Sequence, residues 1–218
     1  MMEVRPVTLA TSRVRLRPLA TDDAPALAEA VRDGELWTLP TTFVPRPADM
    51  QAAIARLLEQ QRAGAVMPFV LEVLDDENGA QVVGATSYMT IVPEHRRLAI
   101  GGTWIARSWQ RSFVNSHAKA LLLAQAFDVL SCNTVQFTAD VLDFAAQDAI
   151  ERLGARQDGV LRGHMVMRDG RVRDTAVYSL LKAEWPMARS RLARSLGPDL
   201  ELLPQASLPR PACLPALA

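Results

Sequence analysis

The order of hydrophobic and polar positions predicts a chain that alternates strands and helices from its beginning. Residues Val14–Leu19 predict an opening strand, and Thr21–Asp23 supplies the cap of a helix that runs to about Arg32. A second helix is expected to start at Pro47 and to end at Gly64. Its apolar side is formed by Met50, Ile54, Leu57 and Leu58.

The middle of the chain predicts three strands and a helix. Phe69–Leu74 and Val82–Ile91 have the pattern of paired strands, with turn residues at Glu77–Gly79 between them. Leu98–Ile105 predicts a buried strand, and a helix is expected over residues 116–130. The apolar stripe of that helix consists of Ala118, Leu121, Leu122, Ala126 and Val129.

The last third continues the alternation. Thr134–Ala139 alternates polar and apolar residues as a half-buried strand does, and Asp143 is a suitable N-cap for a helix that ends at Gly154. The core side of that helix would carry Ala146, Ala149, Ile150 and Leu153. Two final strands, 159–167 and 171–181, flank a hairpin signal at Asp169–Gly170. The order predicts a mixed, mainly antiparallel α/β (α+β) sheet with helices on both faces.

The composition agrees with an ordinary soluble protein: 218 residues, 49% hydrophobic and 22% charged, are enough for one substantial core or a small two-part domain. Because 24 basic residues balance 24 acidic ones, a nucleic-acid partner held by a broad basic surface is not expected. Cys132 and Cys213 have no metal-site spacing and indicate no disulfide framework. Without a signal-peptide core or a run of about 18 apolar residues, the sequence predicts a cytoplasmic protein with no membrane partner.

The chain changes character after residue 196. Five prolines, no helical period and no strand period distinguish residues 197–218 from the domain predicted over residues 1–196. A mobile tail is one interpretation of this segment, and a segment that docks on a partner subunit is the other. The prolines are Pro198, Pro204, Pro209, Pro211 and Pro215.

Residues Gln110–Lys119, between the strand at 98–105 and the following helix, carry the strongest chemical signal. A loop that leads directly into a helix presents unpaired backbone N–H groups and the positive end of the helix dipole. This arrangement suits a phosphate or pyrophosphate group. Arg107 and Arg111 add positive charge nearby.

Together with a series of later motifs, this loop resembles the GNAT superfamily of acyl-CoA-dependent N-acyltransferases. The nearest branch is the one that contains ribosomal-protein N-terminal acetyltransferases, and the resemblance extends from about Val7 to Trp185. It implies a GNAT-like sheet, acetyl-CoA or another acyl-CoA as co-substrate, and no metal. The motifs are Ala149–Ala155, Asp158–Arg162, Asp169–Asp174, Tyr178–Leu180 and Glu184–Pro186.

The resemblance also implies where the donor binds. In the family the pantetheine arm pairs with the strand before the loop, here around Trp104–Arg107, and a backbone N–H faces the thioester oxygen. The pyrophosphate lies on the loop that follows. The residues expected to bind the donor are Trp104, Ile105, Ala106, Arg107, Gln110, Arg111, Ser112, Phe113, Val114, Asn115, Ser116 and Asp143.

The loop departs from the family pattern at its two glycine positions, which are Phe113 and Asn115 here. Glycine permits positive φ and lets the backbone approach a phosphate closely. The Phe113 side chain could block the phosphates, or it could point outward and leave the N–H groups usable. The variant Val114–Lys119 recurs in this branch of the family, and Asn115 or Ser116 is expected to cap the helix.

The family's usual acid–base side chains are also missing. Ala99 stands where the family often has Glu, Asp143 and Ala146 replace the Asn and Ser of a later motif, and Ile150 replaces a frequent Tyr. The substitutes available are Asp143, His164, Tyr178 and His95. Each also has a structural interpretation: a helix cap for Asp143, satisfied strand residues for His164 and Tyr178, and a solvated loop residue for His95.

Two functions therefore remain open at the level of the sequence. One is an N-acetyltransferase acting on a small-molecule amine or a protein N-terminus, in which backbone positioning suffices. The other is a catalytically silent GNAT-like binding or assembly module. By resemblance the acceptor enters between the first two helices and the last hairpin, where Trp37 and His95 are the candidate contacts, and homodimers are common in the family.

Overall fold

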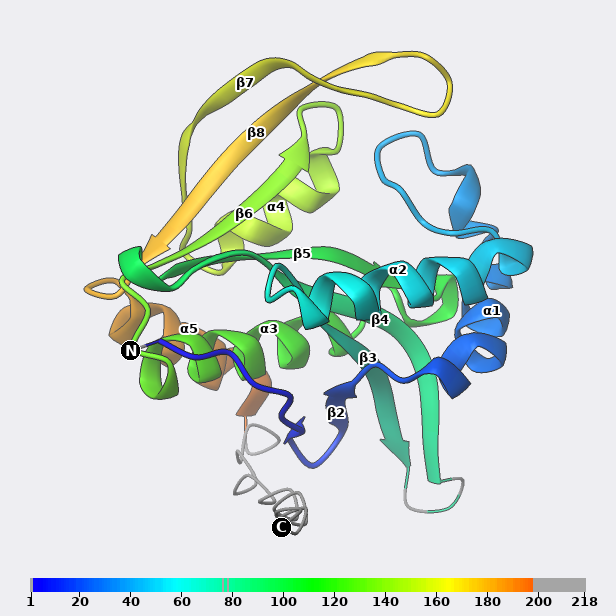
Figure 1. The fold of residues 1–218 in the computed structure, drawn as a ribbon. Coiled ribbons are helices and arrows are strands. Elements are labelled where there is room, and N and C mark those ends of the chain that lie inside the picture. The colour runs from blue at the N-terminus through cyan, green and yellow to red at the C-terminus, as the bar shows by residue number, and fades with distance from the viewer. Residues whose placement is uncertain (1, 76, 78, 198–218) are drawn as a thin grey trace, which may run out of the picture.

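The computed structural model describes residues 2–75, 77 and 79–197, which form one eight-stranded sheet with helices on both faces (Figure 1). The strand order is β1-β2-β3-β4-β5-β6-β8-β7, with β5 and β6 parallel and the other neighbours antiparallel. The predicted mixed, mainly antiparallel sheet is confirmed. The strands are β1 (Leu9–Ala10), β2 (Val14–Pro18), β3 (Met67–Asp75), β4 (Gly79–Val92), β5 (Arg97–Ile105), β6 (Thr134–Asp140), β7 (Arg156–Val166) and β8 (Val172–Leu181).

Five α-helices occur in the described part of the chain, and 3-10 turns precede the first two. These turns are Thr21–Asp23 and Pro47–Asp49. The helices are α1 (Ala24–Arg32), α2 (Met50–Arg62), α3 (Val114–Ala124), α4 (Phe144–Arg152) and α5 (Trp185–Leu196). The first two helices and the helix capped by Asp143 lie close to their predicted bounds.

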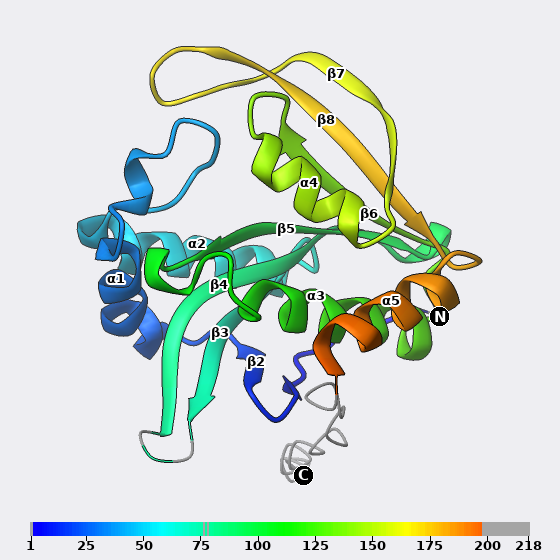
Figure 2. The same ribbon diagram turned by 180° about the vertical axis from the view of Figure 1, so that it is seen from behind.

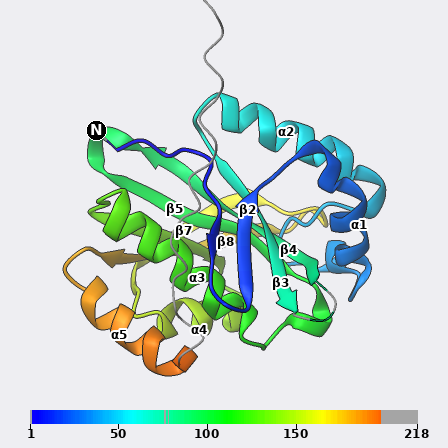
Figure 3. The ribbon, with the colours of Figure 1, turned by 90° about the horizontal axis from the view of Figure 1, so that it is seen from below.

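The helices form two separate layers on the sheet. Helices α1 and α2 pack on one face around a core cluster that includes Leu27, Ile54 and Val70. Helices α3, α4 and α5 contribute to the larger cluster on the other face, where α3 and α5 lie side by side (Figures 2 and 3). Strand β3 supplies both clusters because its successive side chains alternate between faces.

The start of α3 differs from its prediction. The helix begins at Val114, whose N–H donates to Ser112 Oγ at 3.3 Å, and a π-helical turn over Gln125–Val129 follows Ala124. The expectation that Asn115 or Ser116 caps the helix is therefore wrong. Both residues lie inside the first turn because the earlier Ser112 already supplies the hydroxyl.

Two elements of the fold were not predicted from the sequence. Helix α5 was not predicted, although its buried residues recur on one side and Pro186 occupies its first turn. The two-residue strand β1 was also missed. The tail at 198–218 and Asn78 of the predicted turn lie outside the described residues.

Candidate active site

The parallel strands β5 and β6 separate soon after they begin to pair. Their register joins Arg97, Leu98 and Ala99 to the first three residues of β6 and goes no further. Beyond Ala99 the two strands diverge, which Figure 1 shows as β6 rising away from β5. Ile100–Ile105 therefore presents one edge without a strand beside it, and an extended ligand can hydrogen-bond to that edge.

Close backbone approach fixes this part of β5 against β4. A Cβ at Gly84 of β4 would lie 2.2 Å from the carbonyl oxygen of Trp104, so only glycine fits. Gly102 has a φ of 60° at an irregularity of the β4–β5 ladder, which the register shows between Ala85 and Ser87. The edge beside the opening is thus bent and held by its antiparallel neighbour.

The loop that follows β5 is anchored to the end of α1. Asp33 accepts hydrogen bonds from Arg107 N–H through its carbonyl, at 3.0 Å, and from both the N–H and the hydroxyl of Ser108 through its carboxylate. Gly34 beside it has a φ of 90°, and a Cβ there would meet Arg107 Cβ at 2.5 Å. On the other side, Gln110 Nε2 donates to the Ile105 carbonyl at 2.9 Å.

The first turn of α3 leaves backbone donors available. His117 N–H donates to the Phe113 carbonyl at 3.0 Å, but within the described residues Asn115 N–H and Ser116 N–H have no acceptor. Such N–H groups attract an anion at a helix N-terminus. The exposed Arg111 lies just before the helix with a φ of 57°, which is strained for a residue other than glycine.

Phe113 does not need the conformational freedom of the glycine that it replaces. Its φ of −65° and ψ of −21° are ordinary right-handed values. The ring packs edge-on against Trp109 and His117, with centroids 6.2 and 5.5 Å away, and the Arg13 guanidinium carbon lies 3.5 Å from the ring centroid. The side chain is thus held among these three residues. The loop residues expected to bind the donor follow β5 directly, at the end of the strand that is not paired with β6.

The side chains of Trp104 and Ile105 point into the core rather than along the edge. Trp104 packs against the cluster beneath α1 and α2, and Ile105 belongs to the cluster on the other face. Only main-chain groups of these residues are available to a ligand at the edge of the strand. Arg107 and Arg111 are exposed beside it.

On the opposite side, the loop between α1 and α2 is tied to the end of β6. Thr41 Oγ1 donates to Asp143 Oδ2 at 2.9 Å, and Asp143 Oδ1 accepts the Ala146 N–H at 3.0 Å. The capping role predicted for Asp143 is confirmed. Because the same carboxylate accepts the Thr41 hydroxyl, it also ties the α1–α2 loop to the segment that follows β6.

Two arginines of β8 and its preceding turn complete this connection, which we call the acceptor-side clamp (Thr41, Asp140, Asp143, Arg171 and Arg173). Arg171 donates to the Pro40 carbonyl at 3.0 Å and pairs with Asp140, while Arg173 donates to the Thr41 carbonyl at 3.3 Å. Burial opposes ionisation of Asp140, but hydrogen bonds from Arg171 and from Leu142 N–H outweigh it and lower the pKa of that carboxyl.

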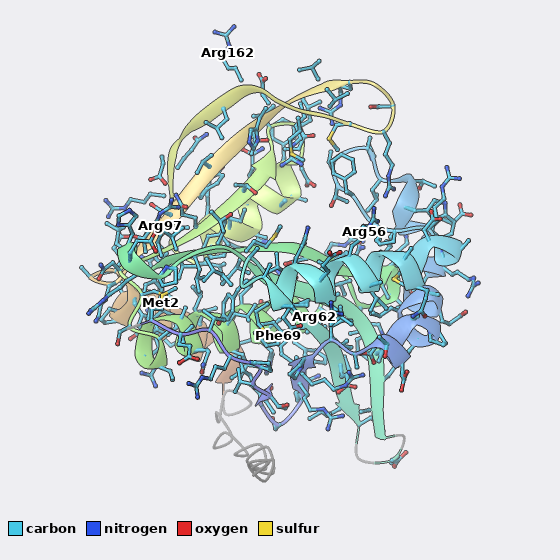
Figure 4. All side chains as sticks on the ribbon, in the orientation of Figure 1. Met2, Arg56, Arg62, Phe69, Arg97 and Arg162 are labelled. Carbon is cyan, nitrogen blue, oxygen red and sulfur yellow. The ribbon has the colours of Figure 1, made fainter. Side chains whose placement is uncertain are left out.

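The β7–β8 hairpin makes a further contact with the same loop. Arg168 donates to the Trp37 carbonyl at 3.1 Å and lies 5.7 Å from the Phe43 ring centroid. Arg168, Phe43 and Arg56 of α2 line a surface cavity of about 560 Å³. Figure 4 shows Arg56 on the side of α2 that faces the hairpin, whereas Arg162 projects from β7 into solvent.

The four candidate acid–base residues are dispersed. Tyr178 is 1% exposed and its hydroxyl donates to Gln147 of α4 at 3.0 Å. His164 is an exposed residue of β7 whose Nδ1 lies 3.1 Å from Thr175 Oγ1. His95 lies in the 3-10 turn before β5, beyond the paired end of the β5–β6 opening. Of the four, Asp143 borders the opening.

One charged residue of α3 was not singled out from the sequence. Lys119 is 7% exposed, and burial lowers the pKa of its ammonium group to about 7. Its Nζ donates to Thr103 Oγ1 of β5 at 2.7 Å. The signal was present in the sequence, because Lys119 interrupts the apolar run from Ala118 to Leu123.

The described residues contain neither a metal-binding cluster of side chains nor a membrane-spanning helix. No group of His, Cys, Asp and Glu side chains in the described part of the chain has an arrangement that would hold a metal ion. Among the helices of residues 2–75 and 79–197, none has both the length and the apolar character required to cross a bilayer.

Comparison with known proteins relates this geometry to a family. A sequence model described as the acetyltransferase (GNAT) domain matches residues 13–156, more than half of the chain. Among solved structures, a protein assigned as an acetyltransferase from T. thermophilus has 33% sequence identity and a TM-score of 0.77, covering 89% of this chain and 100% of that one. The search of curated proteins gave no match.

Two further structures are similar over most of their length. A GCN5-related N-acetyltransferase from Brucella melitensis has 25% identity and a TM-score of 0.77, covering 90% of this chain and 88% of that one. Mycobacterium smegmatis RimJ, solved with CoA-disulfide, has 22% identity and a TM-score of 0.75, covering 87% and 95%. Because the sequence identity with RimJ is 22%, this similarity is evidence for the fold alone.

Proposed function

The chain belongs to the GNAT acetyltransferase family, and from this premise we propose that it transfers an acetyl group from acetyl-CoA to a primary amine of a small molecule or a protein N-terminus. Membership of the family supports acyl transfer from CoA in general. The acetyl group and the primary-amine acceptor belong to the proposal. The supporting relatives include RimJ and a ribosomal L7/L12 alpha-N-protein acetyltransferase, each similar in fold.

The observation that carries the proposal is the combination of an opened strand edge with free N–H groups at the start of α3. Ile100–Ile105 can hydrogen-bond to the pantetheine arm, and Asn115 and Ser116 N–H can face the pyrophosphate. The conformation of Phe113 is compatible with this arrangement, because its backbone is right-handed and its ring packs against Arg13, Trp109 and His117. Exposed Arg111 adds a positive charge at the same loop.

When bound, the thioester supplies the activated acyl carbon, and the protein's task is to orient it and exclude competing water. A backbone N–H on the bent edge of β5 would stabilise negative charge on the carbonyl oxygen. No general acid or base is required for turnover at a reduced rate, since one such group typically contributes about 10²–10⁴-fold. Asp143, at the border of the opening, is the retained candidate for contact with the amine or its departing proton.

The acceptor is proposed to approach beside the acceptor-side clamp and the β7–β8 hairpin. The cavity there carries two guanidinium groups, Arg56 and Arg168, together with Asp49 and the Phe43 ring. Such a lining suits an acceptor that combines polar and apolar groups next to its amine. The Trp37 carbonyl accepts a hydrogen bond from Arg168, which lines the cavity, and the Trp37 ring packs on the α1–α2 cluster.

The alternative is a GNAT-shaped module that binds acyl-CoA without turnover. It is favoured by the residues at the family's usual acid–base positions, which are Ala99, Ala146 and Ile150. The two functions make different predictions for the release of CoA thiol from acetyl-CoA in the presence of amines.

A panel of amines separates the two functions. Peptides with free N-termini, matched N-acetylated peptides and small primary amines would be incubated with acetyl-CoA, and free thiol would be measured. The proposed function predicts thiol release that depends on the free amine and an acetylated product of the corresponding mass. Binding of acetyl-CoA with no product from any amine would support the silent module instead.

A further inference from the structure

Lys119 is buried between α3 and the open part of β5, although nothing in the proposed function so far uses it. The chain has two lysines, and Lys182 is exposed. Lys119 Nζ donates to Thr103 Oγ1 at 2.7 Å. Thr103 belongs to Ile100–Ile105, the segment of β5 that has left β6.

A second hydroxyl meets the first from the neighbouring strand. Thr86 Oγ1 of β4 lies 2.8 Å from Thr103 Oγ1 and is fully buried. Among the described residues, Thr86 Oγ1 has no hydrogen-bond partner other than Thr103. Because a buried hydroxyl donor is almost always satisfied, Thr86 is the donor of this pair and Thr103 the acceptor.

The direction of the Thr103 hydroxyl follows from these two bonds. A hydroxyl has two acceptor lone pairs and one hydrogen. Lys119 and Thr86 occupy both lone pairs, so the hydrogen of Thr103 points away from α3 and β4. Thr103 is half-buried, and on the side away from β4 its strand has already separated from β6.

We propose that Lys119 and Thr86 are positioning residues that orient the Thr103 hydroxyl as a hydrogen-bond donor to the carbonyl oxygen of the donor's acyl group. This inference rests on the proposed function, because the oxygen belongs to acyl-CoA bound along the edge of β5. It adds a side-chain donor to the backbone N–H expected there. A preorganised donor of this kind stabilises the charge that develops on the oxygen during acyl transfer.

The arrangement depends on the protonation of Lys119. An ammonium group has donors only, but a neutral amine has a lone pair that can accept the Thr103 hydrogen and turn it away from the opening. Burial brings the pKa of Lys119 to about 7, so this change falls within an accessible pH range.

The neighbouring titratable groups do not oppose this dependence. Tyr88 of β4 donates its hydroxyl to the Leu122 carbonyl, and burial raises its pKa. His117 on the same helix bonds Thr11. The arginines of α5 are exposed. Arg17 pairs with both Glu72 and Asp23, and this charged group lies on the face of the sheet opposite α3.

The test compares two ligands that differ at one oxygen. Acetyl-CoA and S-ethyl-CoA, in which a methylene replaces the carbonyl, would be titrated calorimetrically into the wild type and three variants. The inference predicts that the wild type at pH 6 prefers acetyl-CoA by roughly 3–10-fold, as for one neutral hydrogen bond. The preference should fall as the pH is raised from 6 to 8.5.

The variants separate the contributions of Thr103 and Lys119 to the preference for acetyl-CoA. Thr103→Val should lose the part of the preference for acetyl-CoA that comes from the hydroxyl and keep only the part that comes from the backbone N–H, while Thr103→Ser should retain the wild-type preference. Lys119→Met, similar in length but without a donor, should reduce the preference and remove its pH dependence. Thermal unfolding of each variant verifies that it is folded, and the wild-type pH series remains informative if a variant is not.

The outcomes distinguish this inference from the proposed function. Equal affinity of the wild type for both ligands at pH 6, or a preference unchanged in Thr103→Val, overturns the role of Thr103 but leaves donor binding intact. A preference that is independent of pH and of Lys119→Met overturns the positioning role of Lys119. Failure to bind either ligand overturns both the inference and the proposed function.

Discussion

Phe113 illustrates how one residue can depart from a family pattern without losing the local backbone. The position tolerates a side chain because its φ is −65°, and the left-handed conformation of the loop falls on Arg111 instead. The sequence could raise the two orientations of the Phe113 ring. It could not choose between them, because the choice depends on Arg13, which tertiary structure brings to the ring from the turn between β1 and β2.

Replacement of Phe113 by alanine should therefore cost stability rather than improve donor binding. The ring contributes two edge-on aromatic contacts and one cation–π contact, so Phe113→Ala should lower the free energy of unfolding by about 2 kcal/mol. Denaturant unfolding would measure the loss, and Phe144→Ala, at an exposed position of α4, is the matched control. A large gain in acetyl-CoA affinity in Phe113→Ala would show that the ring obstructs the phosphates.

Burial of Lys119 should make the stability of the protein depend on pH. Its pKa falls from an ordinary value near 10.5 to about 7 in the folded protein, so between these values the unfolded chain binds more protons. The free energy of unfolding of the wild type minus that of Lys119→Met should thus rise as the pH increases from about 7 to about 10. The slope of this difference should approach roughly 1.4 kcal/mol per pH unit.

The comparison with Lys119→Met is essential because burial also raises the pKa values of Tyr88 and Cys132, which titrate in the same region with the opposite effect. Those groups are present in both proteins and cancel in the difference. Parallel stability curves for the wild type and Lys119→Met across this range would contradict a buried lysine with a lowered pKa.

At the scale of elements, periodic patterns predicted the sheet and four of the five helices of the described chain. The missed helix, α5, carries its buried residues Trp185, Ala188, Leu192 and Leu196 at helical spacing. That signal was available in the sequence. The acceptor-side clamp was not available, because Thr41 and Asp143 are far apart in the chain and meet only when the loop between α1 and α2 reaches the end of β6.

Asp140 holds the clamp together, and its removal should loosen it. The carboxylate is fully buried and pairs with Arg171, so Asp140→Asn should destabilise the protein by about 3 kcal/mol at pH 7. The pKa of Asp140 is lower in the folded protein than in the unfolded chain, where it is about 3.9. The stabilisation is therefore fully present above the pKa of the unfolded chain and is lost as the pH falls through the pKa of the folded protein.

Unfolding measured from pH 7 to pH 2 would test the clamp. The difference between the wild type and Asp140→Asn should shrink below about pH 4. Asp148→Asn, at an exposed position of α4, should behave as the wild type. A difference that stays constant down to pH 2 would mean that ionisation of Asp140 does not stabilise the fold.

At the scale of the whole molecule, the fold was predictable because many weak motifs occur in one order along the chain. The strand, loop and helix proposed to bind the donor were predictable as structural elements as well, since they are consecutive in sequence. The proposed acceptor side combines the α1–α2 loop, the end of β6 and the β7–β8 hairpin, which local patterns do not relate to one another. Acceptor identity consequently has to come from the amine panel.

Calorimetric titration with acetyl-CoA would show whether the start of α3 and the opened edge of β5 bind acyl-CoA. We expect roughly micromolar affinity, weakened about tenfold in Arg111→Ala and unchanged in Arg191→Ala, which removes an exposed arginine of α5. Desulfo-CoA should still bind because it retains the pyrophosphate. Absence of binding of both ligands at millimolar concentration would rule out a donor site at this position.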